Sequence, residues 1–193
     1  MKIKSLFLNL AAVFAIGAAA GAQAAPILIT ASSTDVPVEI CDLCSVTSTV
    51  NIGTHGRVVD VNALLDITHS WDADLILSLT HGAKTIILSN RQGGSGGADY
   101  SGTLFDDAAA VAINAGFAYA PYSGSFKPEE LLAAFNDMDV FGAWTLTAFD
   151  NEFGDSGFIN SFAITAQVPE PGTMALFGLG LAGFAAMRRR KQV

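Results

Sequence analysis

The apolar segments at the two ends of this chain constrain its fold more than any other feature. Residues 6–20 and 172–187 are the only apolar stretches that approach the length of a membrane span. The chain is therefore not a polytopic membrane protein. About residues 25–168 remain between the ends, which is enough to form one domain around a single core.

The N-terminal segment, residues 1–24, has the three parts of a secretory signal peptide. Two lysines form the positive n-region, residues 6–20 form the apolar h-region, and Ala22-Gln23-Ala24 supplies the small residues that signal peptidase requires. We expect cleavage after Ala24. The alternative is an N-terminal membrane anchor, although the h-region is too short for a comfortable span.

The C-terminal segment, residues 168–193, contains a second signal in three parts. A Pro169-Glu170-Pro171 motif comes first, an apolar run over 172–187 follows, and a basic cluster ends it (Arg188, Arg189, Arg190 and Lys191). The cluster holds this end in the cytoplasm, so the body faces outward. The arrangement resembles the PEP-CTERM sorting signal of Gram-negative bacteria. That resemblance implies transit through the inner membrane, cleavage by an exosortase-type transpeptidase, and release or attachment at the cell surface. A plain C-terminal membrane anchor is the alternative, because its span would look the same.

The body alternates apolar and polar residues with the period of two that is typical of β-strands. One short helix is predicted over 128–135, because Pro128 suits the first helical position and two glutamates suit the first turn. Many strands and little helix predict an all-β, jelly-roll-like β-sandwich. The predicted strands cover residues 46–52, 58–68, 75–80, 85–88, 144–148 and 158–166.

Two cysteines, Cys41 and Cys44, lie in a lead-in segment (residues 25–45) ahead of the predicted sandwich (residues 46–167). A thioredoxin-like redox centre needs its C-x-x-C at the start of a helix, but a predicted strand follows here. A zinc site needs two further ligands, and no pair follows at finger spacing. We therefore predict a small disulfide loop that forms in an oxidising compartment.

Negative charge dominates the body. Of 18 acidic residues only Glu170 lies outside it, whereas only four of the 10 basic residues lie inside. Such a body does not bind nucleic acid through its phosphates. The acidic residues cluster near glycines, and Ca²⁺ prefers several carboxylate or carbonyl oxygens from flexible loops. A solvated acidic surface is the alternative. The candidate calcium ligands, expected to meet at one end of the sandwich, are Asp72, Asp74, Asp106, Asp107, Asp150 and Asp155.

The sequence contains no convincing catalytic set. Residues 93–97 satisfy G-x-S-x-G, but a nucleophile elbow requires a strand before it and a helix after it. Here the motif lies in a polar Gly/Ser loop, residues 90–101. The three histidines have no spacing that supports a Ser-His-Asp set, and His69 is expected to be a structural, hydrogen-bonding residue. We therefore expect a chain that is not an enzyme.

Six motifs in order resemble the P domain (P/Homo B domain) found beside the catalytic domain of kexin- and furin-like subtilisin proteases. The resemblance covers about residues 46–167. Ser70, Ala73 and Phe162 depart from the family pattern, in which Thr, Gly and Trp are usual. The six motifs are residues 46–52, 69–75, 104–107, 127–135, 142–146, and the closing turn 150–157 with Asn160-Ser161-Phe162.

The P-domain resemblance implies a jelly-roll β-sandwich that folds and stabilises a neighbouring protease. Some bacterial members look calcium-binding, which strengthens the expectation of Ca²⁺. We find no subtilisin-like catalytic domain in this sequence, so we expect a non-catalytic, exported surface or matrix module. The second hypothesis is an accessory subunit that helps a separate secreted protease to fold. An intrinsic hydrolase ranks third. The expected partners are an exosortase-type enzyme, signal peptidase, and a secreted protease or an extracellular polysaccharide.

Overall fold

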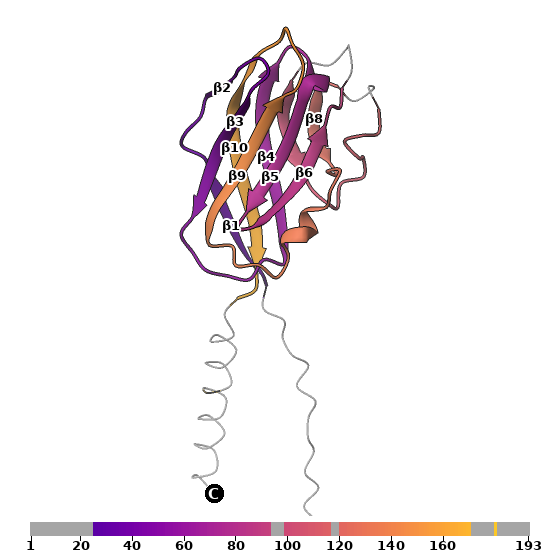
Figure 1. Ribbon diagram of the computed structural model, residues 1–193. Helices are drawn as coiled ribbons and strands as arrows, with labels where there is room; N and C mark the ends of the chain where they lie inside the picture. Colours follow the sequence, from indigo (N-terminus) through magenta and orange to yellow (C-terminus); the bar gives the residue numbers. More distant parts are fainter. Residues whose placement is uncertain (1–24, 94–98, 117–119, 171–179, 181–193) are drawn as a thin grey trace, which may run out of the picture.

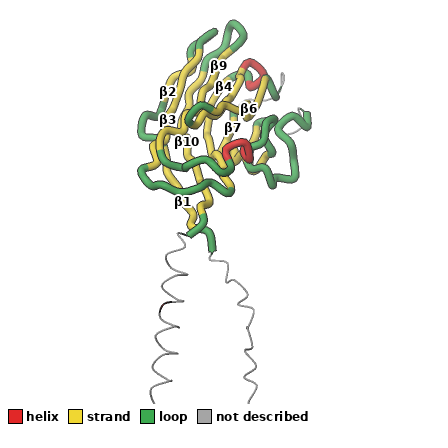
Figure 2. The backbone as a smooth tube through the Cα atoms, turned by 60° about the horizontal axis from the view of Figure 1, so that its bottom comes forward, coloured by secondary structure: helices red, strands yellow, loops and turns green. Residues whose placement is uncertain are grey.

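Two β-sheets packed face to face form the body in the computed structural model, which describes residues 25–93, 99–116, 120–170 and 180 (Figure 1). The all-β sandwich predicted from the sequence is confirmed. Among the described residues from 25 to 170, helix is confined to two short 3₁₀ turns, η1 (Asp72–Asp74) and η4 (Leu132–Phe135) (Figure 2). The strands are β1 (Ile27–Ser32), β2 (Val38–Ile40), β3 (Ser45–Ile52), β4 (Asp60–His69), β5 (Leu75–His81), β6 (Lys84–Asn90), β7 (Tyr100–Phe105), β8 (Tyr122–Phe126), β9 (Gly142–Asp150) and β10 (Gly157–Val168).

The two sheets differ in size and in strand order. The larger sheet has the order β1-β10-β4-β7-β8, with β2 paired to the far end of β10. The smaller sheet has the order β3-β9-β5-β6. Neighbouring strands are antiparallel except β7 and β8, which are parallel. Most neighbours in each sheet are distant in sequence, so the fold depends on long-range pairing.

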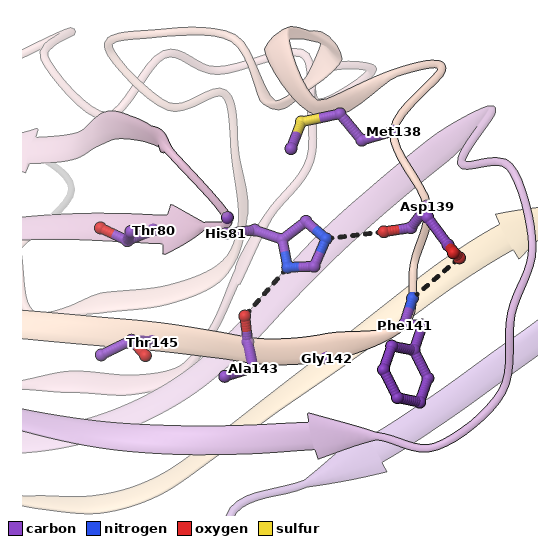
Figure 3. Close-up of a pocket in the computed structure, with 9 residues that line it drawn as sticks. Thr80, His81, Met138, Asp139, Phe141, Gly142, Ala143 and Thr145 are labelled. Carbon is purple, nitrogen blue, oxygen red and sulfur yellow. Dashed lines mark hydrogen bonds between the residues drawn. The ribbon is translucent and has the colours of Figure 1, made fainter.

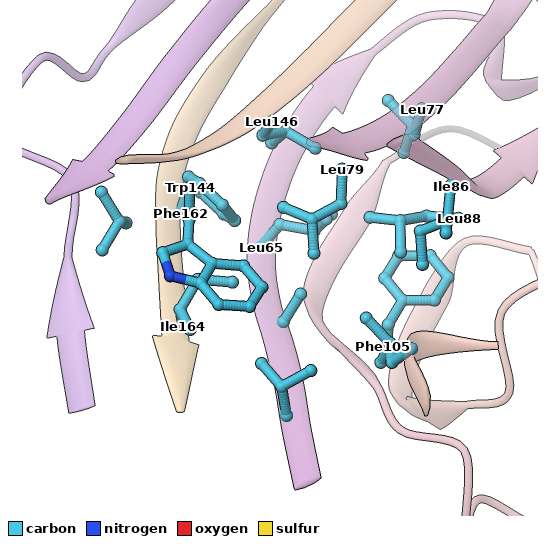
Figure 4. Packing of buried hydrophobic residues seen from close by; sticks show 14 of the residues in the cluster. Leu65, Leu77, Leu79, Ile86, Leu88, Phe105, Trp144, Leu146, Phe162 and Ile164 are labelled. Carbon is cyan, nitrogen blue, oxygen red and sulfur yellow. The ribbon is translucent and has the colours of Figure 1, made fainter. Parts of the chain in front are cut away.

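The core lies between the sheets and contains the apolar residues of the predicted alternation (Figure 4). Leu65 of β4, Leu79 of β5 and Trp144 of β9 are each fully buried. Each contributes about 1.5–3 kcal/mol through burial of apolar surface. Trp144 also donates a hydrogen bond from Nε1 to the Val140 carbonyl oxygen at 3.0 Å. This bond satisfies the one polar atom of the indole inside the core.

A β-bulge interrupts β10 and changes which residues face the core. The register with β4 shifts between Ile159 and Ser161. Before the shift Ile159 is buried and Phe158 is 45% exposed, whereas after it Phe162 is buried. The alternation predicted Phe158 and Phe162 on one face. That prediction is wrong, because the extra residue in a bulge reverses the direction of the side chains that follow.

The helix predicted over 128–135 is also wrong, because Leu131 in its middle has an extended backbone (φ −67°, ψ 136°) and the residues before it bond to β6. The backbone N–H groups of Glu129 and Glu130 donate to the carbonyl oxygens of Leu88 and Ile87 in β6. Their carboxylates accept hydrogen bonds from backbone N–H groups of the same strand. Only η4 remains of the predicted helix.

The lead-in segment 25–45 belongs to the sandwich, which corrects the boundary predicted at residue 46. β1 pairs with β10 from Ile27↔Val168 to Ser32↔Ala163, and β2 pairs with the start of β10. The first and last strands therefore lie side by side. The end of the sandwich where β1 begins at Ile27 and β10 finishes at Val168 is called the exit end below (Figure 1).

Candidate functional site

Four of the six predicted calcium ligands lie at the end of the sandwich opposite the exit end. β4 ends there at His69, η1 carries Asp72 and Asp74, and β9 ends with Asp150 directly across from the first residue of β5. The turn with Asp155 then leads into Gly157, which pairs with His69. We call this the acidic end, defined by Asp72, Asp74, Asp150 and Asp155.

The other two predicted ligands, Asp106 and Asp107, lie elsewhere. They follow β7, whose last residue pairs with Ala63 near the start of β4. Because β4 advances about 3.3 Å per residue, this position is roughly 20 Å along the strand from His69. Asp107 instead accepts hydrogen bonds from the N–H groups of Leu132 and Ala133 at 2.9 and 2.8 Å. The structure does not bring the six together.

Asp72 is the most unusual carboxyl group of the acidic end. Its side chain is fully buried, and its Oδ1 accepts a hydrogen bond from the Asp99 N–H at 2.9 Å. Its Oδ2 has no hydrogen-bond partner in the described structure. Burial raises the pKa of this carboxyl group to about 6, with a smaller contribution from the charge of Asp99. The backbone bond from Asp99 opposes the shift.

The rest of the acidic end holds little compensating charge. Burial raises the pKa of Asp74, and the charges of Asp155, Asp150 and Glu152 raise it further. Arg91 pairs with Glu152 at 2.6 Å, and Ser70 donates a hydrogen bond to Asp155. Carboxylates held this close repel one another, which favours protonation or a bound cation.

The structure assigns a hydrogen-bonding role to His69, as the sequence predicts. Its Nδ1 is 2.9 Å from the Trp71 carbonyl oxygen, and its Nε2 is 3.4 Å from Oδ2 of Asp150. Both side chains are fully buried. This contact ties the end of β4 to the end of β9 across the two sheets.

The described residues do not form a ready metal site. No group of three or more His, Cys, Asp or Glu side chains among them converges in an arrangement that could hold a metal ion. Asp150 accepts from the Glu152 N–H, and Asp106 accepts from the Ala108 N–H. Several predicted ligands thus stabilise turns, because short acidic side chains readily accept backbone N–H groups.

Cys41 and Cys44 form a disulfide, with Cα atoms 5.4 Å apart. The loop that it closes contacts the acidic end directly. The Cys44 carbonyl oxygen accepts the Asp150 N–H at 2.9 Å, and Asp42 accepts the Gly154 N–H at 3.1 Å. The disulfide therefore holds the closing turn of the acidic end in place.

A hollow of about 570 Å³ lies at the exit end between Thr80, Thr145 and Phe141 (Figure 3). His81 points toward two carbonyl oxygens, with Nδ1 at 2.9 Å from Ala143 and Nε2 at 2.7 Å from Asp139. Its ring stacks on Trp144 at 3.9 Å. Both ring nitrogens are therefore occupied. Sequence reasoning missed this hollow, because β5 and the residues before β9 meet only through tertiary pairing.

Several sequence predictions fall outside the described residues. These are the signal peptide at 1–24, Ser95 of the G-x-S-x-G loop, Pro171, and the basic cluster Arg188, Arg189 and Arg190. The apolar run at 172–187 also lies outside them, apart from Gly180. Pro169 and Glu170 follow β10 directly. No helix in the described part of the chain is long and apolar enough to cross a membrane.

Seven chains of solved structures match this chain, and three of them follow. A chain of the Aeromonas sobria serine protease (ASP) and chaperone (ORF2) complex is 15% identical, with a TM-score of 0.47 over 76% of this chain and 28% of that chain. A structure of the serine protease of Aeromonas sobria is 15% identical, with a TM-score of 0.45 over 74% and 27%. FLHE is 10% identical, with a TM-score of 0.46 over 76% and 100%. This chain thus spans under a third of the first two, and no function follows from likeness at this level.

No curated protein matches this chain. A family match covers the C-terminal segment instead. Residues 167–191 match the PEP-CTERM protein-sorting motif, which confirms the resemblance seen in Pro169-Glu170-Pro171 and the residues after it. The chain therefore carries the PEP-CTERM sorting motif of exported proteins of Gram-negative bacteria, which implies processing by an exosortase-type enzyme.

Proposed function

We propose that this chain is a non-catalytic, exported module of the cell surface or extracellular matrix, built on a P-domain-like β-sandwich. One observation carries the proposal: the sorting motif begins at residue 167, within the last residues of β10. A folded β body is thus joined to its sorting segment with almost no linker. The enzyme that cuts the motif therefore acts beside the sandwich. The folded body is the part of the chain that reaches the cell surface or matrix.

The contacts of the buried histidines support a non-catalytic role. A general base needs a ring nitrogen free to take a proton from a nucleophile. Both nitrogens of His81 face carbonyl oxygens, and those of His69 face Trp71 and Asp150. We expect no hydrolysis of casein by the purified protein. Hydrolysis that disappears in Ser95→Ala or His69→Ala would refute this part of the proposal.

The P-domain motifs occupy positions that a sandwich needs, which supports a second candidate function. Trp144 of the Gly-x-Trp-x-Leu strand and Phe162 of the Asn-Ser-Phe motif are buried, and Asp107 binds the N–H groups of η4. In P domains this framework serves a neighbouring protease. The second candidate is therefore an accessory subunit of a separate, secreted subtilisin-type protease.

One experiment separates the two candidates. The processed protein is recovered from the cell surface, immobilised, and exposed to the secreted proteins and to the extracellular polysaccharide of the same cells. Specific retention of a subtilisin-type protease, with less active protease in a deletion strain, favours the accessory function. Retention of polysaccharide favours the matrix function. Unaltered processing in a strain without the exosortase-type enzyme would refute the sorting step that both share.

Calcium binding remains a proposal, now confined to the acidic end. The unpartnered Oδ2 of Asp72 and the crowding of carboxylates around Asp74 support it. A cation bound only to the folded state stabilises it by about 2.7 kcal/mol at a free concentration 100-fold above Kd. We expect Ca²⁺ to raise the Tm measured in EDTA by several degrees, and Mg²⁺ to raise it less.

The matched control for calcium is an exposed carboxylate at the exit end. Asp74→Asn should reduce the stabilisation by Ca²⁺, whereas Asp137→Asn should leave it unchanged. Asp137 is suitable because its side chain is 74% exposed and lies outside the acidic end. Equal Tm values in EDTA, Ca²⁺ and Mg²⁺ would refute calcium binding, and the clustered carboxylates would then be a solvated acidic surface.

A further inference from the structure

The exit end carries exposed apolar side chains around the point where the sorting motif begins. Ile27 is 42% exposed, Leu28 is 61% exposed and Phe141 is 47% exposed. Ile27 and Pro169 line a hollow of about 580 Å³ together with His55, and the His55 ring stacks on Phe141 at 4.2 Å. The three apolar residues thus lie close to one another and to the motif.

The length of chain after β10 limits how far this surface can lie from a membrane. Three residues, Pro169-Glu170-Pro171, separate Val168 from Gly172, where the apolar run begins. Fully extended, the four Cα–Cα steps from Val168 to Gly172 span at most about 14 Å. The headgroup layer on each side of a bilayer is roughly 5–8 Å thick. A sorting segment held in the membrane therefore keeps the exit end at the level of the headgroups or just above them.

Two charged pairs lie beside these apolar residues, which limits the attraction of this part of the exit end to anionic lipid. His55 contacts Asp139 at 2.6 Å, and Arg57 forms an ion pair with Asp137. The acidic end lies at the other end of β4, a strand of 10 residues and so about 30 Å long. That distance is several Debye lengths at physiological ionic strength. Apolar contact is the interaction that this surface can make with lipid.

We propose that the exit end rests on the lipid bilayer while the sorting segment is membrane-inserted, with Ile27, Leu28 and Phe141 buried among the headgroups. The proposal rests on the sorting function proposed above. This contact fixes the orientation of the sandwich and points the acidic end away from the membrane. It also holds Pro169-Glu170-Pro171 at the membrane surface, within reach of a membrane-embedded processing enzyme.

A depth measurement tests the contact. The full chain is reconstituted in phosphatidylcholine vesicles containing a brominated lipid, with a fluorophore on a single introduced cysteine and the Cys41–Cys44 disulfide left oxidised. The probe is placed at Thr54→Cys, beside His55, or at Phe153→Cys in the acidic end, where the native side chain is 83% exposed. We expect at least twofold stronger quenching at position 54, unchanged by 0.5 M salt.

Two variants test whether the exposed apolar side chains cause the stronger quenching at position 54. The double variant Leu28→Ser with Phe141→Ser should lower quenching at position 54 to the level at position 153. Leu64→Ser is the control, because Leu64 is 43% exposed on a sheet face away from the exit end. Substitutions at exposed positions change folding stability by about 0.5 kcal/mol or less. Far-UV circular dichroism verifies that each variant is folded.

Vesicle flotation distinguishes failure of this inference from failure of the proposed function. A chain that does not float with the vesicles lacks the membrane-inserted sorting segment, which refutes both. A chain that floats but shows equal quenching at positions 54 and 153 keeps the sorting function and refutes the docking. Quenching at position 54 that survives the double variant refutes the role of the apolar side chains.

Discussion

Replacing Asp72 with Asn should alter how the stability of this protein depends on pH. Burial raises the pKa of Asp72 from 3.8 to about 6 in the folded state. The folded protein therefore binds this proton more tightly than the unfolded chain does. Its stabilising effect is fully present below pH 3.8 and is lost as the pH rises through about 6.

The size of the effect follows from the two pKa values. A pKa difference of about two corresponds to roughly 3 kcal/mol at 1.36 kcal/mol per pKa unit. Most of it falls between pH 4 and pH 7, so the wild type should lose about 2 kcal/mol over this range through Asp72. Asp72→Asn cannot titrate and removes this loss. Its buried amide group lacks a partner for its N–H groups, which costs about 1–3 kcal/mol at every pH.

Urea denaturation at pH 4, 5, 6 and 7 measures the effect, with far-UV circular dichroism as the signal and EDTA present to exclude cations. The difference in free energy of unfolding, variant minus wild type, should rise by about 2 kcal/mol from pH 4 to pH 7. The variant is the less stable protein at pH 4 and gains on the wild type as the pH rises. A difference that stays constant across this range would refute the assignment of a raised pKa to buried Asp72.

Three further predictions concern processing, the disulfide and one glycine. The mature exported protein should start at Ala25 and lack the C-terminal arginines by intact mass, and a mature species running from Met1 to Val193 would contradict this. Cys41→Ser with Cys44→Ser should lower the free energy of unfolding by about 2 kcal/mol, the value expected for a four-residue loop. The double variant should also make the Asp150–Gly157 turn more sensitive to protease. An unchanged urea midpoint would contradict a stabilising role of the disulfide. Gly157→Ala should destabilise the protein by about 3 kcal/mol, because its Cβ would lie 2.0 Å from the Thr68 carbonyl oxygen. Gly53→Ala, with nothing within 4 Å of its Cβ, is the matched control in the same denaturation assay.

Local patterns predicted the strands whose own residues alternate. β4, β5 and β9 bury the apolar residues that the sequence placed on one face, and β3, β6 and β10 also lie where expected. β1, β2, β7 and β8 were not predicted. β8, for example, buries only Tyr122 and Phe126 around a Ser-Gly-Ser centre, so its own residues carry almost no alternation. Such strands form because the adjacent strands of the sheet supply hydrogen-bond partners and packing contacts.

The candidate calcium ligands show in the same way that local sequence patterns do not reveal which residues long-range pairing brings together. Each pair of carboxylates was visible in the sequence, and Asp72 with Asp74 does lie beside Asp150 and Asp155. Asp106 is far away because β7 runs antiparallel to β4, a relation that only the sheet topology fixes. The burial of Asp72, which gives it an unusual proton affinity, depends on a close approach: a Cβ on Gly93 would lie 2.7 Å from that of Asp72.

The contacts of Glu129 and Glu130 with β6 have a consequence for the behaviour of the chain in a crowded compartment. β6 is an outer strand of the smaller sheet, and an uncovered outer strand can pair with a strand of another molecule and begin aggregation. Here the two glutamates occupy the N–H groups of Ile87 and Asn90 with their carboxylates, and the carbonyl oxygens of Ile87 and Leu88 with their own N–H groups. The segment that fails to become a helix thus covers the outer side of β6, which hinders edge-to-edge pairing between copies at this strand.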